Sequence, residues 1–181
     1  VRALNSRLPP AITVKSVQLA PSQFHARSSA LRKTYIYRID NSPVRSPFQT
    51  RFSLHVPRPI DLNQLNQLSQ ALLGEHDFQS FQSRGTELRT TRRTLFHAVW
   101  MKKPSGHVEF QVTGSGFLKQ MVRNIVGTLL QMQSRGANKT EVEALLRAQD
   151  RRQAGPTASA NGLFLKRVVY PRSLDKLCHT L

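Results

Sequence analysis

The stretch that decides the fold is Gly116-Phe117-Leu118-Lys119-Gln120-Met121-Val122-Arg123-Asn124-Ile125-Val126-Gly127. Its apolar residues recur at helical spacing and continue through Leu130, which predicts an amphipathic helix with one buried face. Arg123 lies on the flank of the apolar stripe, on the same side as Gly116 and Gly127. Small neighbours leave room for a group to approach the guanidinium, although a single Arg in such a helix is usually a solvent-facing side chain.

The segments around this helix predict a mixture of strands and helices. Alternating apolar residues predict strands at 12–19, 33–39, 52–56 and 162–170, and a hairpin formed by 94–101 and 107–113. Asp61 and Gly74 predict the two ends of a Leu-rich helix, and Thr140 with Glu143 predicts the capping box of another. Residues 82–93 predict an exposed basic loop. The mixture predicts an α+β fold with a largely antiparallel mixed sheet.

The charge of the chain points to a polyanionic partner. The 27 Lys and Arg residues against 10 Asp and Glu give a net charge of +17, which favours RNA or another polyanion. RNA-modifying enzymes and structural RNA-binding proteins share such a charge, so it does not distinguish them. The absence of a long apolar run argues against a membrane span.

The composition also bears on metals and disulfides. Cys178 is the sole cysteine, which excludes an internal disulfide and a Cys-rich zinc site. The six His residues lie far apart in the sequence, without pairing at helical spacing. We therefore expect no metal site.

Five segments resemble, in the same order, the motifs of TruA-type tRNA pseudouridine synthases, and together they span nearly the whole chain. The helical stretch resembles the family's F-x-x-x-M-V-R-N-I-V-G motif. The other four are residues 3–9 (A-L-N-x-x-L-P), 24–39 (F-H-A-R followed by a K/R-x-Y-x-Y strand), 73–81 (L-x-G-x-H-D-F-x-S-F) and 150–165 (D-R-x-x-A-G-P-T-A through G-L-x-L).

The resemblance implies a pseudouridine synthase-like fold, with helices packed on one face of the sheet and an RNA cleft on the other. It assigns residues 1–171 to the C-terminal region of that fold and leaves residues 172–181 as a basic C-terminal tail. The implied reaction breaks the N-glycosidic bond of uridine and reattaches the uracil through its carbon 5, after the uridine has left its stack. The reaction uses no metal and no cofactor.

The resemblance also carries over individual residues. Arg123 matches the Arg that pairs with the family's nucleophilic Asp, and Tyr35 matches the active-site Tyr. From strand alternation alone, Tyr35 is an ordinary aromatic on a buried face. The residues expected to bind RNA, mainly through phosphates, are Arg27, Arg32, Lys33, Arg84, Arg89, Arg92, Arg93 and Lys119.

The family's nucleophilic Asp lies in a G-R-T-D motif upstream of A-L-N-x-x-L-P. None of the five Asp residues of this chain follows Arg-Thr, and the chain begins at Val1. We therefore expect the chain to be inactive alone. One hypothesis is the RNA-binding, C-terminal portion of a synthase whose nucleophile is supplied by another segment. The alternative is a non-catalytic RNA-binding protein derived from this fold, such as a structural component of an organellar ribosome.

Both hypotheses give structured RNA, either tRNA or rRNA, as the partner. A second copy of the chain or ribonucleoprotein subunits are the further partners to be considered. The expected location is the cytoplasm or an organellar matrix, in a mitochondrion or plastid.

Overall fold

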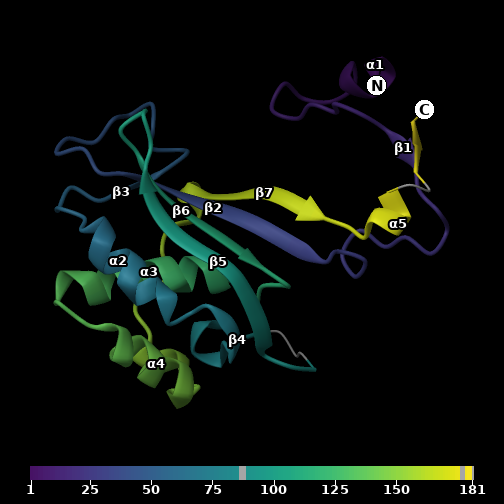
Figure 1. Cartoon of the computed structure of the whole chain (residues 1–181). Helices are drawn as coiled ribbons and strands as arrows, with labels where there is room; N and C mark the ends of the chain where they lie inside the picture. The colour runs from purple at the N-terminus through teal and green to yellow at the C-terminus, as the bar shows by residue number, and fades with distance from the viewer. Residues whose placement is uncertain (86–88, 176–177, 181) are drawn as a thin grey trace. The chain divides into compact units, whose positions relative to one another are not determined.

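The computed structural model describes residues 1–85, 89–175 and 178–180, and it divides into two compact units (Figure 1). The first unit contains residues 1–31 and 169–181, and the second contains residues 32–168. The predicted central helix and the large sheet both belong to the second unit.

The first unit is built from short elements, which are α1 (Arg2–Asn5), β1 (Gln18–Leu19), α5 (Arg172–Asp175) and β8 (His179–Thr180). Strand β1 pairs antiparallel with β8. The strand predicted at 12–19 is therefore much shorter than expected, since Val14 is held by the Asn5 side chain instead of a neighbouring strand. Residues 172–175 form α5 and residues 179–180 form β8; the assignment of 172–181 as a tail outside the family region stays a prediction.

The second unit contains a six-stranded sheet in the order β3-β2-β6-β5-β4, with β7 pairing with β2. The pairs β2–β6, β5–β6 and β4–β5 are antiparallel, and β2–β3 is parallel. This arrangement confirms the α+β fold and the hairpin. The strands are β2 (Arg32–Asp40), β3 (Leu54–His55), β4 (Gly74–Asp77), β5 (Arg92–Lys102), β6 (Val108–Gly114) and β7 (Leu163–Val169).

Three helices gather on one face of this sheet: α2 (Leu62–Gln70), α3 (Met121–Ser134) and α4 (Lys139–Ala148) (Figure 1). The side chain of Asp61 accepts hydrogen bonds from two N–H groups at the start of α2, which confirms the predicted cap. The core between the layers includes Tyr37, Trp100 and Phe110, all almost fully buried. Three 3₁₀ turns complete the unit: η1 (Gln79–Phe81), η2 (Arg151–Gln153) and η3 (Ala160–Gly162).

Helix α3 begins later than the sequence predicts. It starts at Met121 instead of near Gly116, because Gln120 adopts a left-handed conformation (φ 59°) that a right-handed helix cannot include. Leu118 is nevertheless buried, so the apolar pattern reports burial on both sides of this turn.

The capping box of α4 also differs from the prediction. It is formed by Asn138 and Glu141, which exchange hydrogen bonds between side chain and backbone, and not by Thr140 and Glu143. Glu143 instead faces Lys139 one turn away.

Among the described residues, no helix is long and apolar enough to span a bilayer.

Candidate catalytic and RNA-binding site

Arg123, in the first turn of α3, is joined to the loop before η3 by two reciprocal hydrogen bonds. Its Nε donates to the carbonyl oxygen of Ala158 over 2.7 Å. The backbone N–H of Ala158 donates in return to the carbonyl oxygen of Arg123 over 3.1 Å. The Arg123 side chain is half-buried, and no described acidic side chain forms an ion pair with it. The guanidinium is thus oriented by a backbone carbonyl and not by an acidic side chain of the described residues.

The loop that holds Arg123 lies very close to α3. A methyl group on Gly127 would collide with the carbonyl oxygen of Pro156, and one on Gly155 would lie 2.8 Å from Cα of Thr128. The N–H of Gly155 donates to the Thr128 hydroxyl over 3.0 Å. Glycines at both contact points therefore allow the loop backbone to lie against the helix.

Arg151, in η2, fastens the same loop from its other side. Its Nη1 donates to the carbonyl oxygens of Ala154 and Gly155, over 3.2 and 2.9 Å. Its Nη2 donates to Asn124 Oδ1 and to the Thr157 hydroxyl, over 3.2 and 3.1 Å. The Thr157 hydroxyl also donates to Asn124 Oδ1 over 2.6 Å. Arg123 and Asn124 are neighbours on α3, so one network sets the positions of helix and loop together.

Sequence reasoning did not assign a role to Arg151, Asn124 or Thr157. The signal was present, because Asp150-Arg151-Arg152 and Ala154-Gly155-Pro156-Thr157-Ala158 belong to one of the five family-like segments. The sequence does not show whether Arg151 or Arg152 forms hydrogen bonds with the loop. The turn of η2 determines that it is Arg151. Arg152 points elsewhere and pairs with Asp150.

Two tyrosines of β2 lie on the same side of the strand but have different partners. Tyr37 is fully buried and donates its hydroxyl to the carbonyl oxygen of Ser159 over 2.7 Å. Burial raises the pKa of Tyr37 to about 12, and the charge of Arg123 only partly opposes this shift. Tyr37 is therefore neutral, and its hydroxyl already donates to Ser159 near Arg123.

Tyr35 is only partly buried, and its ring meets the edge of Phe117 with the centroids 5.1 Å apart. Within the described part of the chain its hydroxyl makes no hydrogen bond. Of the two tyrosines, Tyr35 is thus the one whose hydroxyl remains available to a ligand.

One end of the sheet gathers four of the predicted RNA-binding residues, and we call Arg32, Lys33, Arg92 and Arg93 the basic end. The strand register brings these residues to the same end, because Lys33 on β2 pairs with Gly114 on β6, which pairs with Leu95 on β5. The guanidinium of Arg32 lies over the ring of Phe96, 4.6 Å from its centroid. Residues sixty positions apart in sequence therefore share this end.

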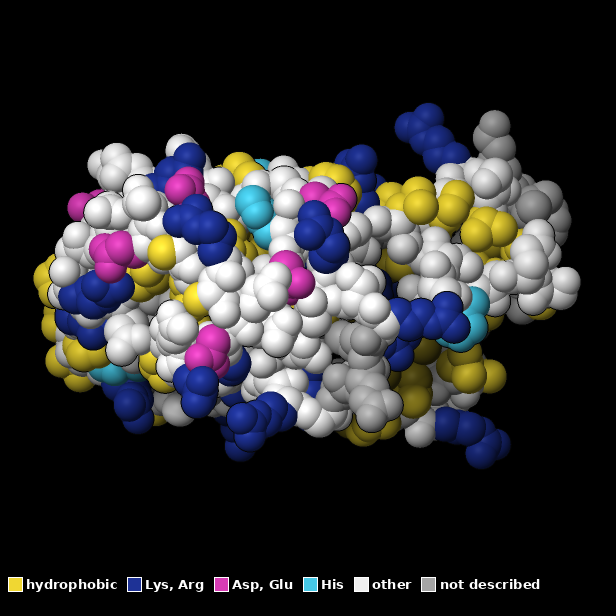
Figure 2. Space-filling model, turned by 90° about the horizontal axis from the view of Figure 1, so that it is seen from below, with side chains coloured by type: hydrophobic (Ala, Val, Ile, Leu, Met, Phe, Trp, Pro, Cys, Tyr) yellow, Lys and Arg dark blue, Asp and Glu magenta, His cyan; other side chains and the backbone are white. Residues whose placement is uncertain are grey.

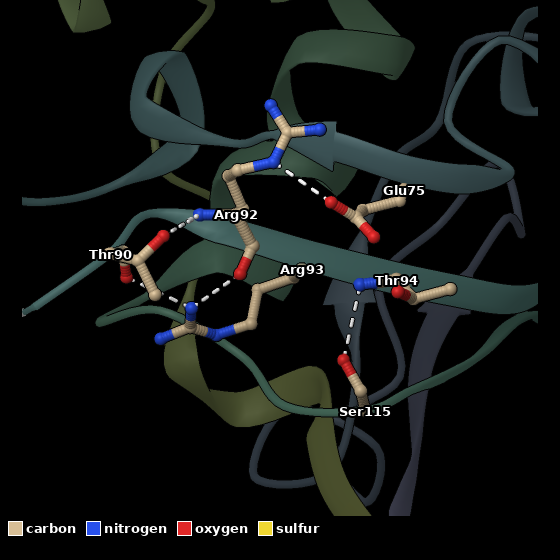
Figure 3. A network of polar contacts seen from close by, with 6 residues as sticks. All are labelled: Glu75, Thr90, Arg92, Arg93, Thr94 and Ser115. Atoms are coloured by element: carbon tan, nitrogen blue, oxygen red, sulfur yellow. Dashed lines mark hydrogen bonds and ion pairs between the residues drawn. The ribbon is translucent and has the colours of Figure 1, made fainter.

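The interactions of Arg92 and Arg93 are drawn in Figure 3. Arg92 Nε donates to Glu75 Oε1 over 2.8 Å in an exposed ion pair (Figure 3). Arg93 Nη1 donates to the carbonyl oxygens of Thr90 and Arg92, over 2.9 and 2.6 Å. Partial burial lowers the pKa of Arg93. Both side chains are therefore held by local contacts at the start of β5.

Two more of the residues expected to bind RNA, Arg84 and Lys119, are in contact beside the segment that leads into α3. Lys119 Nζ donates to the carbonyl oxygen of Arg84 over 3.0 Å, and the Ser83 N–H donates to the carbonyl oxygen of Lys119. The Arg93 side chain passes beside Gly116 in the same connection. The structure thus brings Arg84, Lys119 and the basic end to the segment that leads into Arg123.

The remaining predictions are not gathered in this way. Arg89 is exposed, and residues 86–88 of the predicted basic loop lie outside the described residues. Arg27 is exposed in the first unit, whose placement relative to this site is not defined. In Figure 2, Lys and Arg side chains are scattered over the visible face, and several of them have an Asp or Glu side chain beside them.

In the described ranges no group of three or more His, Cys, Asp or Glu side chains is placed to hold a metal ion. The arrangement instead offers guanidinium and ammonium groups, an oriented Arg and an available Tyr hydroxyl. Such a set can bind phosphates and orient a carboxylate or a base.

Comparison with known proteins agrees with this arrangement. Residues 68–171 match the family model of tRNA pseudouridine synthases. The chain is 48% identical over 176 residues to a tRNA pseudouridine synthase A from Bdellovibrio bacteriovorus, which covers 97% of this chain and 67% of the relative. Similar proteins of that name from Syntrophotalea carbinolica and Geobacillus kaustophilus are 45% and 41% identical and cover 92% and 93% of this chain.

The chain spans about two thirds of the length of these relatives, with 66% of the Syntrophotalea protein and 65% of the Geobacillus protein covered. The family match includes Arg123, Arg151 and the loop between them, which form the network described above. By the family model, which matches more than half of the chain, and by these sequence identities, the chain belongs to the tRNA pseudouridine synthase family.

Proposed function

We propose that this chain provides the RNA-binding surface and the Arg123 side of the catalytic site in a synthase that converts uridine to pseudouridine in tRNA. The observation that carries the proposal is the orientation of Arg123. One nitrogen, Nε, is fixed to Ala158, and the two terminal nitrogens form no hydrogen bond within the described residues. A guanidinium held in this way is ready to accept a carboxylate through its two terminal nitrogens.

In the proposed reaction the bond between uracil N1 and ribose C1′ breaks, and a bond between C5 and C1′ forms. The proton on C5 is lost and N1 gains one, so the change is an isomerisation. The chain's own residues supply three functions: Arg123 orients the nucleophilic carboxylate, Tyr35 contacts the extruded base, and the basic end holds the flanking phosphates. Tyr37 supports the loop through Ser159 and takes no proton, because its pKa is about 12.

None of the carboxylates in the described residues pairs with Arg123, so we propose that the nucleophile comes from a segment outside these 181 residues. This is the feature that separates the catalytic hypothesis from a purely RNA-binding role. The relatives named above carry synthase names and none carries a ribosomal name. We therefore favour the synthase.

The test is release of tritium from tRNA transcripts labelled at C5 of uridine. The chain alone should bind the transcript and release no tritium. The same chain preceded by a family segment with the Gly-Arg-Thr-Asp motif should release it. In that fusion Arg123→Met should reduce the rate on the order of 10²- to 10³-fold, as for removal of one oriented charged group from an active site.

A matched variant controls for folding. Arg135→Met changes a more exposed Arg at the other end of α3, where it pairs with Glu141, and it should leave the rate unchanged. Tritium release that is insensitive to Arg123→Met would overturn the assignment of Arg123. Tight, salt-dependent RNA binding without release by the fusion would favour the non-catalytic alternative.

A further inference from the structure

The connection between β2 and β3, residues 41–53, presents an aromatic ring to solvent that the proposed function does not use. The side chain of Phe48 is 86% exposed, which is far above the exposure of the aromatic residues in the core. Phe52 and Val44 in the same segment are 51% and 81% exposed. We call this segment the Phe48 loop. Three exposed apolar side chains within one short loop offer a contact surface, because clustered exposed apolar groups mark interaction sites.

Hydrogen bonds within the Phe48 loop show that it is ordered. The Gln49 N–H donates to the carbonyl oxygen of Ser46 over 3.1 Å, and the Phe52 N–H donates to that of Gln49 over 2.9 Å. Ser46-Pro47-Phe48-Gln49 is therefore a turn with Pro at its second position, where the fixed φ of Pro is favourable. Phe48 follows Pro47 in a turn that is already formed, so its exposure is built into the loop.

The base of the Phe48 loop is tied to the strand and loop that carry the candidate site. Asn161 Nδ2, in η3, donates to the carbonyl oxygen of Thr50 over 2.8 Å. A cavity of about 210 Å³ beneath the loop is lined by residues that include Arg45, Thr50, Ser159 and Asn161. Ser159 directly follows Ala158, the partner of Arg123. The Phe48 loop thus adjoins the segment that anchors Arg123.

The charge of this region selects the kind of partner. Residues 41–60 contain Arg45, Arg51 and Arg58 and no acidic residue, and Asp40, which lines the cavity beneath the loop, is buried. Arg45 and Arg51 are exposed on either side of Phe48 and form no ion pair within the described residues. An exposed aromatic ring flanked in the sequence by two exposed arginines fits an unpaired nucleotide, whose base can stack on the ring while neighbouring phosphates meet the guanidinium groups.

We propose that the Phe48 loop is a second RNA-contacting surface, on which Phe48 stacks against an unpaired base and Arg45 and Arg51 bind the adjacent phosphates. The inference rests on the proposed function for the identity of the partner, an RNA with single-stranded loops. Strand β2 separates the Phe48 loop from the basic end, because Lys33 and Asp40 lie roughly 25 Å apart along an extended strand. The RNA therefore contacts both ends of one strand, with the Arg123 site between them.

The test is binding of the 181-residue chain, by fluorescence anisotropy, to a tRNA transcript and to a blunt RNA duplex of similar length. Phe48→Ser should weaken binding to the transcript roughly 5- to 100-fold, the loss expected when one aromatic–base stack is removed. Its effect on the duplex should be within about twofold, because a duplex offers no unpaired base. Phe48→Tyr should restore binding to the transcript.

Val44→Ser is the matched control, since Val44 is about as exposed as Phe48, lies in the same loop and has no ring. It should change neither affinity. Arg45→Gln and Arg51→Gln should each lower the slope of log affinity against log salt by about one. Because all four side chains are exposed, these variants should fold like the parent, which a thermal melt checks.

Two results would overturn the inference. One is a Phe48→Ser variant that binds the transcript as tightly as Val44→Ser. The other is a change in sedimentation coefficient with unchanged RNA affinity, which would make the Phe48 loop a contact between protein copies. A triple variant, in which Arg89, Arg92 and Arg93 are each replaced by Gln, distinguishes failure of this inference from failure of the proposed function. If that variant loses affinity for both RNAs while Phe48→Ser does not, RNA binding at the basic end stands and only the Phe48 loop assignment fails.

Discussion

Arg123 is held through a single side-chain nitrogen, and this decides what it can do. If both terminal nitrogens of a guanidinium were hydrogen-bonded within the protein, the guanidinium could not form a bidentate pair with a carboxylate or phosphate. In Arg123, Nε donates to the carbonyl oxygen of Ala158, and within the described residues the two terminal nitrogens remain available to a bound carboxylate or phosphate. Sequence reasoning placed Arg123 correctly on the flank of an apolar helix, but the carbonyl that orients it comes from residue 158 and has no local sequence signal.

At the same scale, Arg151 should be far more important for stability than its neighbour Arg152. Arg151→Met removes four hydrogen bonds and leaves backbone carbonyls of the loop without donors, which should lower the free energy of unfolding by about 2–3 kcal/mol. The side chain of Arg152 is 83% exposed and, among the described residues, pairs only with Asp150, so Arg152→Met should hardly change the urea midpoint. Equal effects of the two changes would contradict the proposed network.

Tyr37 predicts a loss of stability in alkali. Its pKa is raised from 10.0 to about 12 by burial, so the folded state favours the neutral phenol. Its contribution is fully present below pH 10 and is lost as the pH rises towards 12, a change on the order of 2–3 kcal/mol.

Urea melts between neutral pH and pH 11.5 measure this effect. Tyr37→Phe, which has no phenol to ionise, should show a smaller decrease over the same range. It should also be less stable at neutral pH by about 1 kcal/mol, because the bond to Ser159 is lost. The prediction is wrong if both proteins have the same pH dependence above pH 10.

The elements that the sequence predicted well are those with strong local signals. The cap of α2 at Asp61 and the β5–β6 hairpin depend on one side chain and one turn, and both are confirmed. The start of α3 was placed too early, because an apolar pattern reports burial and not backbone conformation. The pattern continues through the left-handed Gln120, which only the connection from β6 to α3 requires.

The contact between α3 and the 154–158 loop should make Gly127 intolerant of any side chain. Within a helix, Gly→Ala ordinarily stabilises by about 1 kcal/mol. At Gly127 the added methyl group would collide with the Pro156 carbonyl oxygen, so Gly127→Ala should instead destabilise by about 1–3 kcal/mol.

Gly136→Ala separates this effect from backbone strain. Gly136 has open space around it but a positive φ of 73°, so its substitution should cost about 1–2 kcal/mol and leave RNA modification by the fusion protein intact. Gly127→Ala should impair modification as well, since it displaces the carbonyl partner of Arg123. A Gly127→Ala variant with raised stability and full activity would disprove the close contact.

For the whole molecule, the positive charge was evident from composition, but its placement was not. The sequence predicted Arg32, Lys33, Arg92 and Arg93 as separate RNA contacts, and the strand register brings them to one end of the sheet. Such convergence depends on pairings between distant segments, which a single sequence does not specify. For the same reason the Arg151 network could be proposed only once the loop and the helix were seen together.

The basic end predicts steeply salt-dependent RNA binding. Affinity should fall on the order of 10³-fold or more between low and moderate salt if several phosphates are contacted. Replacing Arg89, Arg92 and Arg93 together with Gln should weaken binding about equally for unrelated RNA sequences and lower the salt slope by up to about three.

A variant with the same loss of charge provides the control. Arg135, Lys139 and Arg147 lie at the end of α3 and on α4, and their joint replacement by Gln should lower the slope less. If the two triple variants behave alike, net charge and not the basic end governs binding. A change in sequence preference would instead make the residues around the start of β5 base readers.

The two hydrogen bonds between Arg123 and Ala158 allow the opening of the candidate site to be measured at one backbone amide. The Ala158 amide is bonded to the Arg123 carbonyl oxygen, so its hydrogen can exchange with deuterated water only when the loop lifts from α3. The exchange rate of this one amide therefore measures how often the loop lifts from α3, an opening that also separates the guanidinium from the Ala158 carbonyl oxygen. A bound RNA that uses the anchored form should slow that exchange, even before any chemistry takes place.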